Sequence, residues 1–347
     1  MKDGLLNWGI CSAGKISNDF ALALQNLPTT EHQICAVAAR DGDRAKEFAD
    51  KLKIPKYYSS YKELAENPEI DVVYIGAVNT QHYNVAKLMM ESGKHVLCEK
   101  PLCVNSAETT GLLNIAREKN VFLMEAIWSR CFPAYSKLKE LIASGVIGEV
   151  GHVQVSFGEF SSKLVPRIEL KELAGGALLD RGIYAIQFAQ FVFDEKPINQ
   201  ITMGSLIAPS GPDNKVHIIL QYPNNKTAIV STSLLENLPN EGVICGTKGV
   251  IRVCFPVWCP TKIEVSVKYK EKEIFEFPLP PTPDMEGCKF VFRNGQGLKY
   301  EAEEVRRCII NGLTESPLLT HNMSQDIADI MDSARKSIGY KLPQDKE

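Results

Sequence analysis

The chain has 347 residues, of which 44% are hydrophobic and 23% are charged, and its formal net charge is −3. This balance is typical of a soluble globular protein, and the length favours two domains. A slightly acidic chain has no electrostatic reason to bind nucleic acid or an anionic membrane surface. No apolar run approaches the ~18 residues that a membrane-spanning helix needs, so we expect no membrane partner.

The ten cysteines are scattered along the chain, and several lie inside apolar runs. No two of them have the CxxC spacing that is common among zinc ligands, so the sequence predicts no metal site. Residues 1–8 also lack the apolar core of a secretory signal peptide. We therefore expect a cytoplasmic protein whose cysteines are reduced thiols, most of them packed in the core.

The first 120 residues alternate between short apolar runs and amphipathic helical patterns. The runs typical of strands cover residues 8–11, 33–39, 72–75, 95–98 and 121–124. The patterns typical of helices cover residues 16–27, 43–52, 83–92 and 107–119. This order predicts an α/β domain over residues 1–127, with the doubly wound parallel sheet of a Rossmann fold.

Strand-like runs dominate after residue 150, separated by turn-forming residues. They cover residues 151–157, 200–205, 216–222, 227–234, 242–245, 250–254, 263–268 and 273–277, with turns predicted at 224–225 and 247–249. Helical patterns return at 300–311 and 324–337. We expect residues 128–347 to form an α+β domain with a large, mostly antiparallel open sheet. An apolar open face on such a sheet needs cover, which favours a homodimer.

The first strand leads into a segment rich in small residues, in which Ser12, Gly14 and Ser17 occupy the three positions of a dinucleotide-binding fingerprint. Only the central position is glycine, so the pattern alone is also that of a tight structural turn. Its place between a strand and a helix favours the nucleotide site. The helix N-terminus, with Lys15 and Ile16, would then bind phosphate through backbone N–H groups.

The residues after the second and third strands bear on the choice of cofactor. Arg40 ends the second strand and Arg44 follows at the start of the next helix, and guanidinium groups suit the 2′-phosphate of NADP. Asp41 could instead bind the ribose 2′-hydroxyl, so NAD remains an alternative cofactor. Both arginines could also be solvated surface residues. Asn79 and His82 follow the third strand at the ligand-binding edge of the sheet. His82 could equally cap the next helix.

Two segments carry residues suited to acid–base chemistry. Lys100 follows a strand and precedes Pro101, a position from which a lysine can act on bound cofactor and substrate. Asp180 and Tyr184 are spaced i,i+4, so on a helix they share one face. Lys100 could instead be a surface lysine, and Tyr184 a core tyrosine. Together the two segments favour hydride-transfer chemistry over a mere nucleotide-binding fold.

At this point the sequence resembles the glucose–fructose oxidoreductase/inositol dehydrogenase superfamily, and within it the branch of dimeric dihydrodiol dehydrogenases. The resemblance runs from Trp8 to Asp345. The segments that carry it are residues 36–41, 98–101, 122–128, 175–180 and 246–249. It implies an NADP-dependent homodimeric enzyme that oxidises trans-dihydrodiols of aromatic hydrocarbons, D-xylose or both.

The resemblance also implies roles for single residues. Lys100 and Tyr184 would be catalytic with Asp180 in support, and Glu99 would lie at the cofactor. The residues expected near the cofactor–substrate cleft are Trp128, Arg130 and Phe157. Two positions depart from relatives: Arg181 replaces an aliphatic residue, and Cys131 replaces an aromatic one. Because a helix turns about 100° per residue, Arg181 is expected to point away from the Asp180 face.

The expected mechanism is oxidation of a secondary alcohol or a sugar hemiacetal. Tyr184 would remove the hydroxyl proton, and the ammonium group of Lys100 would favour the phenolate that this requires. Asp180 would orient the pair or bind substrate. The alternative function is a non-catalytic NADP-binding protein, regulatory or structural, that keeps the same fold.

Overall fold

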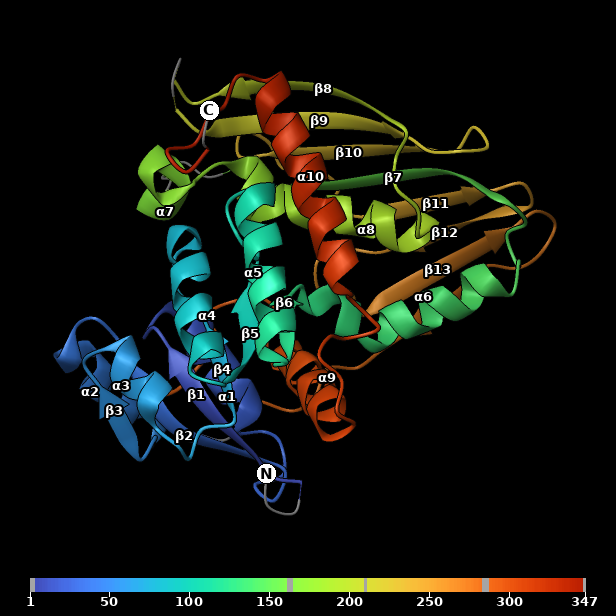
Figure 1. The fold of residues 1–347 in the computed structure, drawn as a ribbon. Coiled ribbons are helices and arrows are strands. Elements are labelled where there is room, and N and C mark those ends of the chain that lie inside the picture. The colour runs from blue at the N-terminus through green and yellow to red at the C-terminus, as the bar shows by residue number, and fades with distance from the viewer. Residues whose placement is uncertain (1–3, 161–164, 209–210, 283–286, 346–347) are drawn as a thin grey trace. The chain divides into compact units, whose positions relative to one another are not determined.

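A computed structural model describes residues 4–160, 165–208, 211–282 and 287–345. It divides into two compact units (Figure 1). Unit 1 comprises residues 1–103, 107–128 and 279–321, and unit 2 comprises residues 104–106, 129–278 and 322–347. The sequence suggested one boundary after residue 127. In the structure, residues 279–321 belong with the N-terminal part, because the helix within them packs on the first helix of the chain.

Unit 1 contains a six-stranded parallel sheet in the order β3-β2-β1-β4-β5-β6. Its strands are β1 Leu6–Cys11, β2 His32–Ala38, β3 Lys56–Tyr58, β4 Val72–Ile75, β5 His95–Glu99 and β6 Leu123–Ala126. The predicted doubly wound sheet is therefore confirmed. The sequence pattern did not predict β3, because its three residues, two of them exposed, carry too little hydrophobic pattern to reveal a strand.

The helices of unit 1 pack on both faces of this sheet. They are α1 Lys15–Leu24, α2 Gly42–Leu52, α3 Tyr61–Glu66, α4 His82–Glu91, α5 Ser106–Lys119 and α9 Leu298–Ile310, with short turns η1 Asn79–Gln81 and η5 Gly295–Gly297. Strand β4 shows both faces: Tyr74 stacks on Phe20 of α1 at 3.8 Å between ring centroids, whereas Val73 and Ile75 belong to the core that includes residues of α3, α4 and α5. Burial on both faces explains the continuous apolar run of β4.

Unit 2 contains an eight-stranded sheet in the order β14-β13-β12-β11-β7-β10-β9-β8. Its strands are β7 Val150–Gly158, β8 Asn199–Leu206, β9 Asp213–Gln221, β10 Thr227–Ser233, β11 Gly242–Gly246, β12 Gly249–Val253, β13 Lys262–Val267 and β14 Glu273–Glu276. Only the β7–β10 pair is parallel, so the expectation of a mostly antiparallel sheet is confirmed. The predicted turns at 224–225 and 247–249 connect β9 to β10 and β11 to β12.

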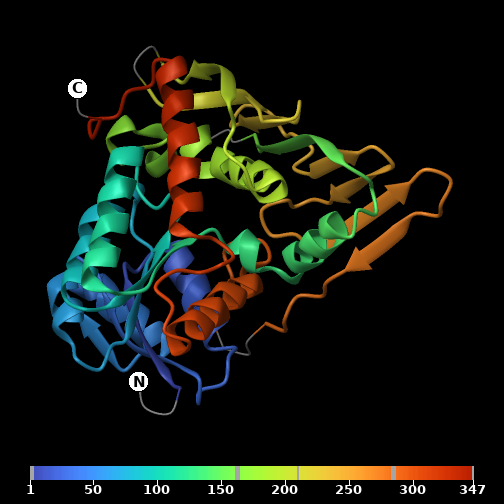
Figure 2. The ribbon, with the colours of Figure 1, turned by 45° about the vertical axis from the view of Figure 1, so that its right-hand side comes forward.

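Helices cover one face of this sheet. The helices and turns of this part are η2 Trp128–Cys131, α6 Pro133–Ala143, α7 Pro166–Glu169, η3 Lys171–Leu173, the π-helix η4 Leu178–Gly182, α8 Ile183–Phe193 and α10 His321–Ser337. Helix α8 packs against β7, β10 and β11, and α6 packs against β13 (Figure 2). Ile201, Met203 and Ile219 remain 56%, 72% and 44% exposed. Ile201 and Ile219 are register partners, so their side chains share one face.

All ten cysteines are free thiols, and seven of them are buried. Among the described residues, no helix combines the length and the hydropathy that crossing a membrane requires.

Candidate active site

The turn between β1 and α1 lies close to the segment that follows β4. Ser12 adopts φ 82°, and Gly14 caps α1 without a side-chain hydrogen bond. A Cβ on Gly76, after β4, would collide with the buried hydroxyl of Ser17. The two chain segments can therefore approach closely only because Gly76 has no side chain. Exposed Lys15 and half-exposed Ile16 begin the helix, so its first N–H groups are open to an anion.

The end of β2 presents two exposed arginines next to this turn. Asp41 caps α2, because its Oδ1 accepts hydrogen bonds from the backbone N–H groups of Asp43 and Arg44 at 3.0 and 3.2 Å. Arg44 Nη2 donates to the carbonyl of Ala13 at 3.4 Å, within the glycine turn. Arg40 is exposed. The only carboxylate that the sequence offered for a ribose hydroxyl is thus engaged in helix capping.

Asn79 and His82 differ in what they can reach. Asn79 lies in η1 and is partly exposed. His82 is fully buried, with Nδ1 2.8 Å from the carbonyl of Pro101 and Nε2 3.1 Å from the carbonyl of Ala77. Burial lowers the pKa of His82, although both carbonyls act in the opposite direction. The ring therefore joins the segment after β4 to the segment after Lys100.

Four contacts hold the segment that contains Lys100. Before it, the carboxylate of buried Glu99 accepts a hydrogen bond from the Tyr74 hydroxyl at 2.7 Å and one from the backbone N–H of Lys100 at 3.2 Å. After it come the His82 contact and a hydrogen bond from Leu102 N–H to the Glu125 carboxylate at 2.8 Å. Lys100 itself is half-buried. The lysine is thus placed by a rigid frame, as a functional side chain requires.

A second buried carboxyl group lies close to this frame. Glu301 of α9 is 0% exposed, and neither of its carboxyl oxygens has a hydrogen-bond partner among the described residues. Burial and the negative charge of Glu99 raise the pKa of Glu301 well above its usual range. A carboxyl group whose pKa is higher in the folded than in the unfolded state makes the protein less stable as the pH rises through that interval.

We therefore expect Glu301→Gln to stabilise the protein at neutral and alkaline pH. The gain should be about 1.4 kcal/mol in the free energy of unfolding for each unit by which the fold raises the pKa of Glu301, because glutamine has no charge to bury. It should vanish below the usual glutamate pKa, where Glu301 is protonated in both states. Urea titrations at several pH values measure this, with exposed Glu303→Gln on the same helix as the control. A gain that is independent of pH would contradict the assignment.

In unit 2, Asp180 and Tyr184 come from a widened helical segment. Asp180 lies in the π-helix η4, and Tyr184 follows in α8. Asp180 Oδ1 accepts from Arg167 Nη1 at 2.5 Å. The Tyr184 ring lies 5.9 Å from the ring of Phe157, which stacks on Trp258 at 3.9 Å. The tyrosine is 7% exposed, so an aromatic cluster shields it from water on this side.

Arg181 does not lie where regular helical geometry placed it. Its Nε is 4.0 Å from Asp180 Oδ2, so the expectation that it points away from the Asp180 face is wrong. The segment is a π-helix, which does not turn by 100° per residue. The guanidinium is buried, and its Nη1 donates to the carbonyls of Glu159 and Ser233 at 2.6 and 2.8 Å. Burial lowers its pKa.

Arg130 is buried at the start of unit 2 and ties this region to α8. Its guanidinium donates to the side chain and carbonyl of Gln187 at 2.6 and 2.8 Å, and to Gln190 Oε1 at 2.8 Å. Gln187 in turn donates to the carbonyl of Tyr184 at 3.0 Å. Arg130 therefore stabilises α8, the helix that contains Tyr184. Trp128 is 5% exposed at the end of unit 1.

Sequence reasoning missed Trp258 and Arg167, which contact Phe157 and Asp180 respectively. Neither lies in a motif, and each reaches its contact from a segment distant in the chain or outside any periodic element. Only the folded structure shows that these two residues contact Phe157 and Asp180. No group of three or more histidine, cysteine or acidic residues that could hold a metal ion occurs within the part of the chain that the structure describes.

Comparison with curated proteins shows close relatives over nearly the whole chain. The chain is 44% identical over 336 residues to Trans-1,2-dihydrobenzene-1,2-diol dehydrogenase of Xenopus tropicalis, covering 97% of this chain and 99% of the relative. Proteins of the same name from Sus scrofa and Homo sapiens are 45% and 44% identical, each covering 98% of this chain and 99% of the relative.

Solved structures share the fold at lower identity. A levoglucosan dehydrogenase in complex with NADH and levoglucosan aligns with a TM-score of 0.83 at 22% identity, over 98% of this chain and 100% of that one. A 3-ketoreductase variant from Actinomadura kijaniata in complex with NADP aligns with a TM-score of 0.80 at 22% identity, over 97% and 99%.

Two family models match the chain in sequence. The first, described as an oxidoreductase family with an NAD-binding Rossmann fold, matches residues 6–127, and the second, the GFO/IDH/MocA C-terminal domain, matches residues 135–252. The resemblance seen in the sequence is thereby confirmed. The chain therefore belongs to the GFO/IDH/MocA family of oxidoreductases.

Proposed function

We propose that this protein is an NADP-dependent dehydrogenase that oxidises trans-dihydrodiols of aromatic hydrocarbons, D-xylose or both. The observation that carries the proposal is the 44–45% identity, over almost the full length of both chains, to proteins named for oxidation of a dihydrodiol. Of the two substrates, the names of the relatives support the diol. The sugar rests on the resemblance of the sequence to a branch that also oxidises D-xylose.

The cofactor is NADP, held by the parallel-sheet domain. The glycine turn with Ser12 and Gly14 accommodates the pyrophosphate, and Arg40 and Arg44 accommodate the 2′-phosphate. The engagement of Asp41 in capping α2 supports NADP over NAD. When bound, the nicotinamide supplies the hydride acceptor. Further cofactor contacts are assigned to Lys15, Ile16, Asn79, His82, Glu99 and Lys100, with His82 and Glu99 acting by holding the segment around Lys100.

The proton is moved by Tyr184, assisted by Lys100. A free tyrosine has a pKa of about 10, so as a base near neutrality it needs help from a positive charge. Lys100 supplies that charge, and its frame of Glu99, His82 and Leu102 supports a fixed position. Asp180, already paired with Arg167, orients substrate hydroxyl groups. In unit 2, Phe157 would contact the substrate, and Arg130 would act on it by supporting the helix that carries Tyr184. Trp128 would be a further substrate contact.

A substrate panel tests this function. The purified protein is mixed with NADP and either trans-1,2-dihydrobenzene-1,2-diol, D-xylose or an anionic hydroxy acid, and NADPH formation is followed by absorbance. We expect the diol and the sugar to give higher kcat/KM than the acid, because Arg181 is buried and its Nη1 is bonded to the carbonyls of Glu159 and Ser233. A carboxylated substrate that exceeds both would contradict the assignment. No turnover with any substrate would favour the non-catalytic alternative.

We also propose that the protein is a cytoplasmic homodimer. Ten free thiols suit a reducing compartment. The exposed apolar side chains Ile201, Met203 and Ile219 on β8 and β9 support burial of the open sheet face against a second copy.

The dimer proposal predicts the effect of a charge on that face. Met203→Glu should convert the dimer into a monomer at micromolar concentration, because a carboxylate in an apolar interface loses its hydration. Light scattering with size exclusion measures the mass. Ile310→Glu, at an exposed position at the end of α9, is the control and should remain dimeric. A wild-type protein that is monomeric throughout would refute the proposal.

A further inference from the structure

A glycine pair, Gly175–Gly176, lies one residue before the π-helix, and its second member adopts a conformation that other residues rarely reach. Gly176 has φ 111°, and a Cβ there would collide with the carboxylate of Asp213. Its N–H donates to the carbonyl of Ile168 at 2.9 Å, and a Cβ on Gly175 would collide with the same carbonyl. Only glycine fits both positions, so the turn Gly175–Gly176 is fixed by what packs against it.

Asp213 holds this turn from the side of the sheet. It is the first residue of β9, is 0% exposed, and its Oδ2 accepts the backbone N–H of Leu178 at 2.8 Å. Its Oδ1 has no hydrogen-bond partner among the described residues and packs against Gly176. Burying a carboxylate costs free energy of folding. At Asp213 this cost is offset in part by the hydrogen bond to the backbone of Leu178.

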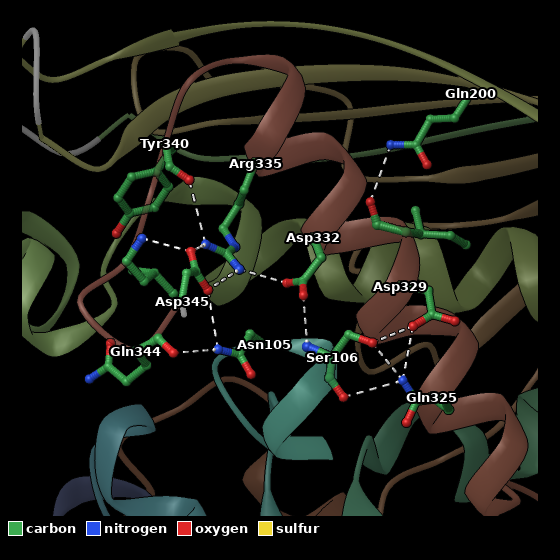
Figure 3. A network of polar contacts seen from close by, with 12 residues as sticks. Asn105, Ser106, Gln200, Gln325, Asp329, Asp332, Arg335, Tyr340, Gln344 and Asp345 are labelled. Atoms are coloured by element: carbon green, nitrogen blue, oxygen red, sulfur yellow. Dashed lines mark hydrogen bonds and ion pairs between the residues drawn. The ribbon is translucent and has the colours of Figure 1, made fainter. Parts of the chain in front are cut away.

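The C-terminal segment holds the same turn from another side. The hydroxyl of Tyr340 donates to the carbonyl of Gly175 at 3.1 Å. The segment is itself anchored, because buried Arg335 pairs with Asp332 and Asp345, each at 2.6 Å (Figure 3). The backbone N–H of Tyr340 donates to the carbonyl of Arg335 at 2.9 Å. The segment that carries Tyr340 is therefore anchored to α10 where the tyrosine contacts the turn.

We propose that Asp213 and Tyr340 are positioning residues for the dehydrogenase reaction, because together they fix the Gly175–Gly176 turn from which the segment with Asp180 and Tyr184 starts. Neither residue is assigned contact with substrate or cofactor. The inference rests on the proposed function, in which Tyr184 moves the proton. It deepens that function by making the C-terminal end of the chain part of what aligns the tyrosine.

The charge on Asp213 should affect how firmly it holds the turn. Burial raises the pKa of Asp213 to about 7, although the N–H groups that it accepts and the charge of Arg335 act in the opposite direction. The titratable and charged groups nearest to it are Arg335 on α10 and Tyr340 in the C-terminal segment, and Asp345 and Glu172 act in turn on Tyr340. Hydrogen bonds to an ionised acceptor are about twice as strong as neutral ones, so ionisation above pH 7 strengthens the hold on the turn. As for Glu301, burying that charge lowers the stability of the whole fold over the same pH interval.

Asp213→Asn tests this by keeping an acceptor oxygen and removing the charge. The readout is the single-turnover rate of NADPH formation at pH 6 and pH 8.5, with the better substrate of the panel. We expect the wild-type rate to exceed the variant rate by about 3–10-fold at pH 8.5, the scale of one charge-assisted hydrogen bond against a neutral one, and by much less at pH 6. Ionisation of Tyr184 occurs in both proteins and cancels in the ratio.

Tyr340→Phe tests the second contact without a change of charge. It should lower the single-turnover rate several-fold and leave the dissociation constant for NADPH unchanged, because Tyr340 is bonded to unit 2 and not to the nucleotide turn. Tyr222→Phe is the matched control: Tyr222 is a buried tyrosine of the same unit whose hydroxyl has no hydrogen-bond partner among the described residues. It should turn over like wild type.

The outcomes separate the inference from the function on which it rests. If Tyr184→Phe is inactive while Asp213→Asn and Tyr340→Phe match wild type at both pH values, the positioning role is wrong and the proposed function stands. A rate ratio for Asp213→Asn that is equal at pH 6 and pH 8.5 overturns the role of the charge. If Tyr184→Phe is fully active, the proposed function itself fails.

Discussion

Replacing Tyr184 with phenylalanine is expected to lower kcat by about 10²–10⁴-fold, the usual contribution of a general acid–base group. The ring stays, so its packing against Phe157 should persist and the fold should be kept. NADPH binding should also persist, because the phenol belongs to unit 2. Steady-state rates and a fluorescence titration with NADPH measure the two quantities. Near-wild-type turnover in this variant would refute the mechanism.

Lys100→Met should produce a loss of similar size, because the phenolate then lacks its supporting charge. The matched control is Lys94→Met. Lys94 is another lysine of unit 1 and is buried, but its ammonium donates to the carbonyls of Asn67 and Ile70 and has no proposed part in the reaction. Its loss should lower stability and leave the turnover of the folded fraction unchanged.

The double variant Tyr184→Phe with Lys100→Met tests whether the two residues act as a pair. Groups that work on the same step are strongly non-additive, so the double variant should lose about as much activity as the more damaging single variant. Losses that multiply would mean that the two side chains act independently. Such a cycle measures their coupling directly, through the reaction itself.

The features that the sequence revealed are those that depend on local pattern. Buried parallel strands such as β4 are continuous apolar runs, and the Asn224-Asn225 pair marks a hairpin because both residues have positive φ. Lys100 and Tyr184 could be singled out because they stand in motifs. In each case neighbours in the chain supplied the whole signal.

What the sequence did not reveal depends on contacts between distant segments. The π-helix around Asp180 has no pattern of its own, and the geometry of a regular helix misplaced Arg181. Asp213 precedes the strand that the sequence predicted at 216–222, and nothing in the local pattern indicates its contact with the backbone of Leu178. The sequence also did not show that residues 279–321 belong to unit 1. Its pattern predicts α9 as a helix, but not that this helix packs on α1.

Replacing Arg40 with alanine is expected to weaken NADP binding by roughly 1.5–3 kcal/mol, the scale of a hydrogen bond to a charged group. NAD binding should change little, because NAD has no 2′-phosphate. Arg44→Ala should have a smaller effect, since part of its guanidinium already bonds to Ala13. Fluorescence titration of each variant with NADPH and with NADH measures the two dissociation constants and shows whether only NADP binding is weakened.

The control for this experiment is Arg117→Ala, which removes another exposed arginine of unit 1, one that bonds to Asn114 near the end of α5. It should leave both dissociation constants unchanged. Because the 2′-phosphate carries charge, the preference for NADP in the wild type should also shrink as salt is added, whereas Arg40→Ala should respond less. Equal weakening of NADP and NAD by Arg40→Ala would place Arg40 at a part of the site that both cofactors share. Asp41, whose carboxylate caps α2, would then be the group that selects the ribose.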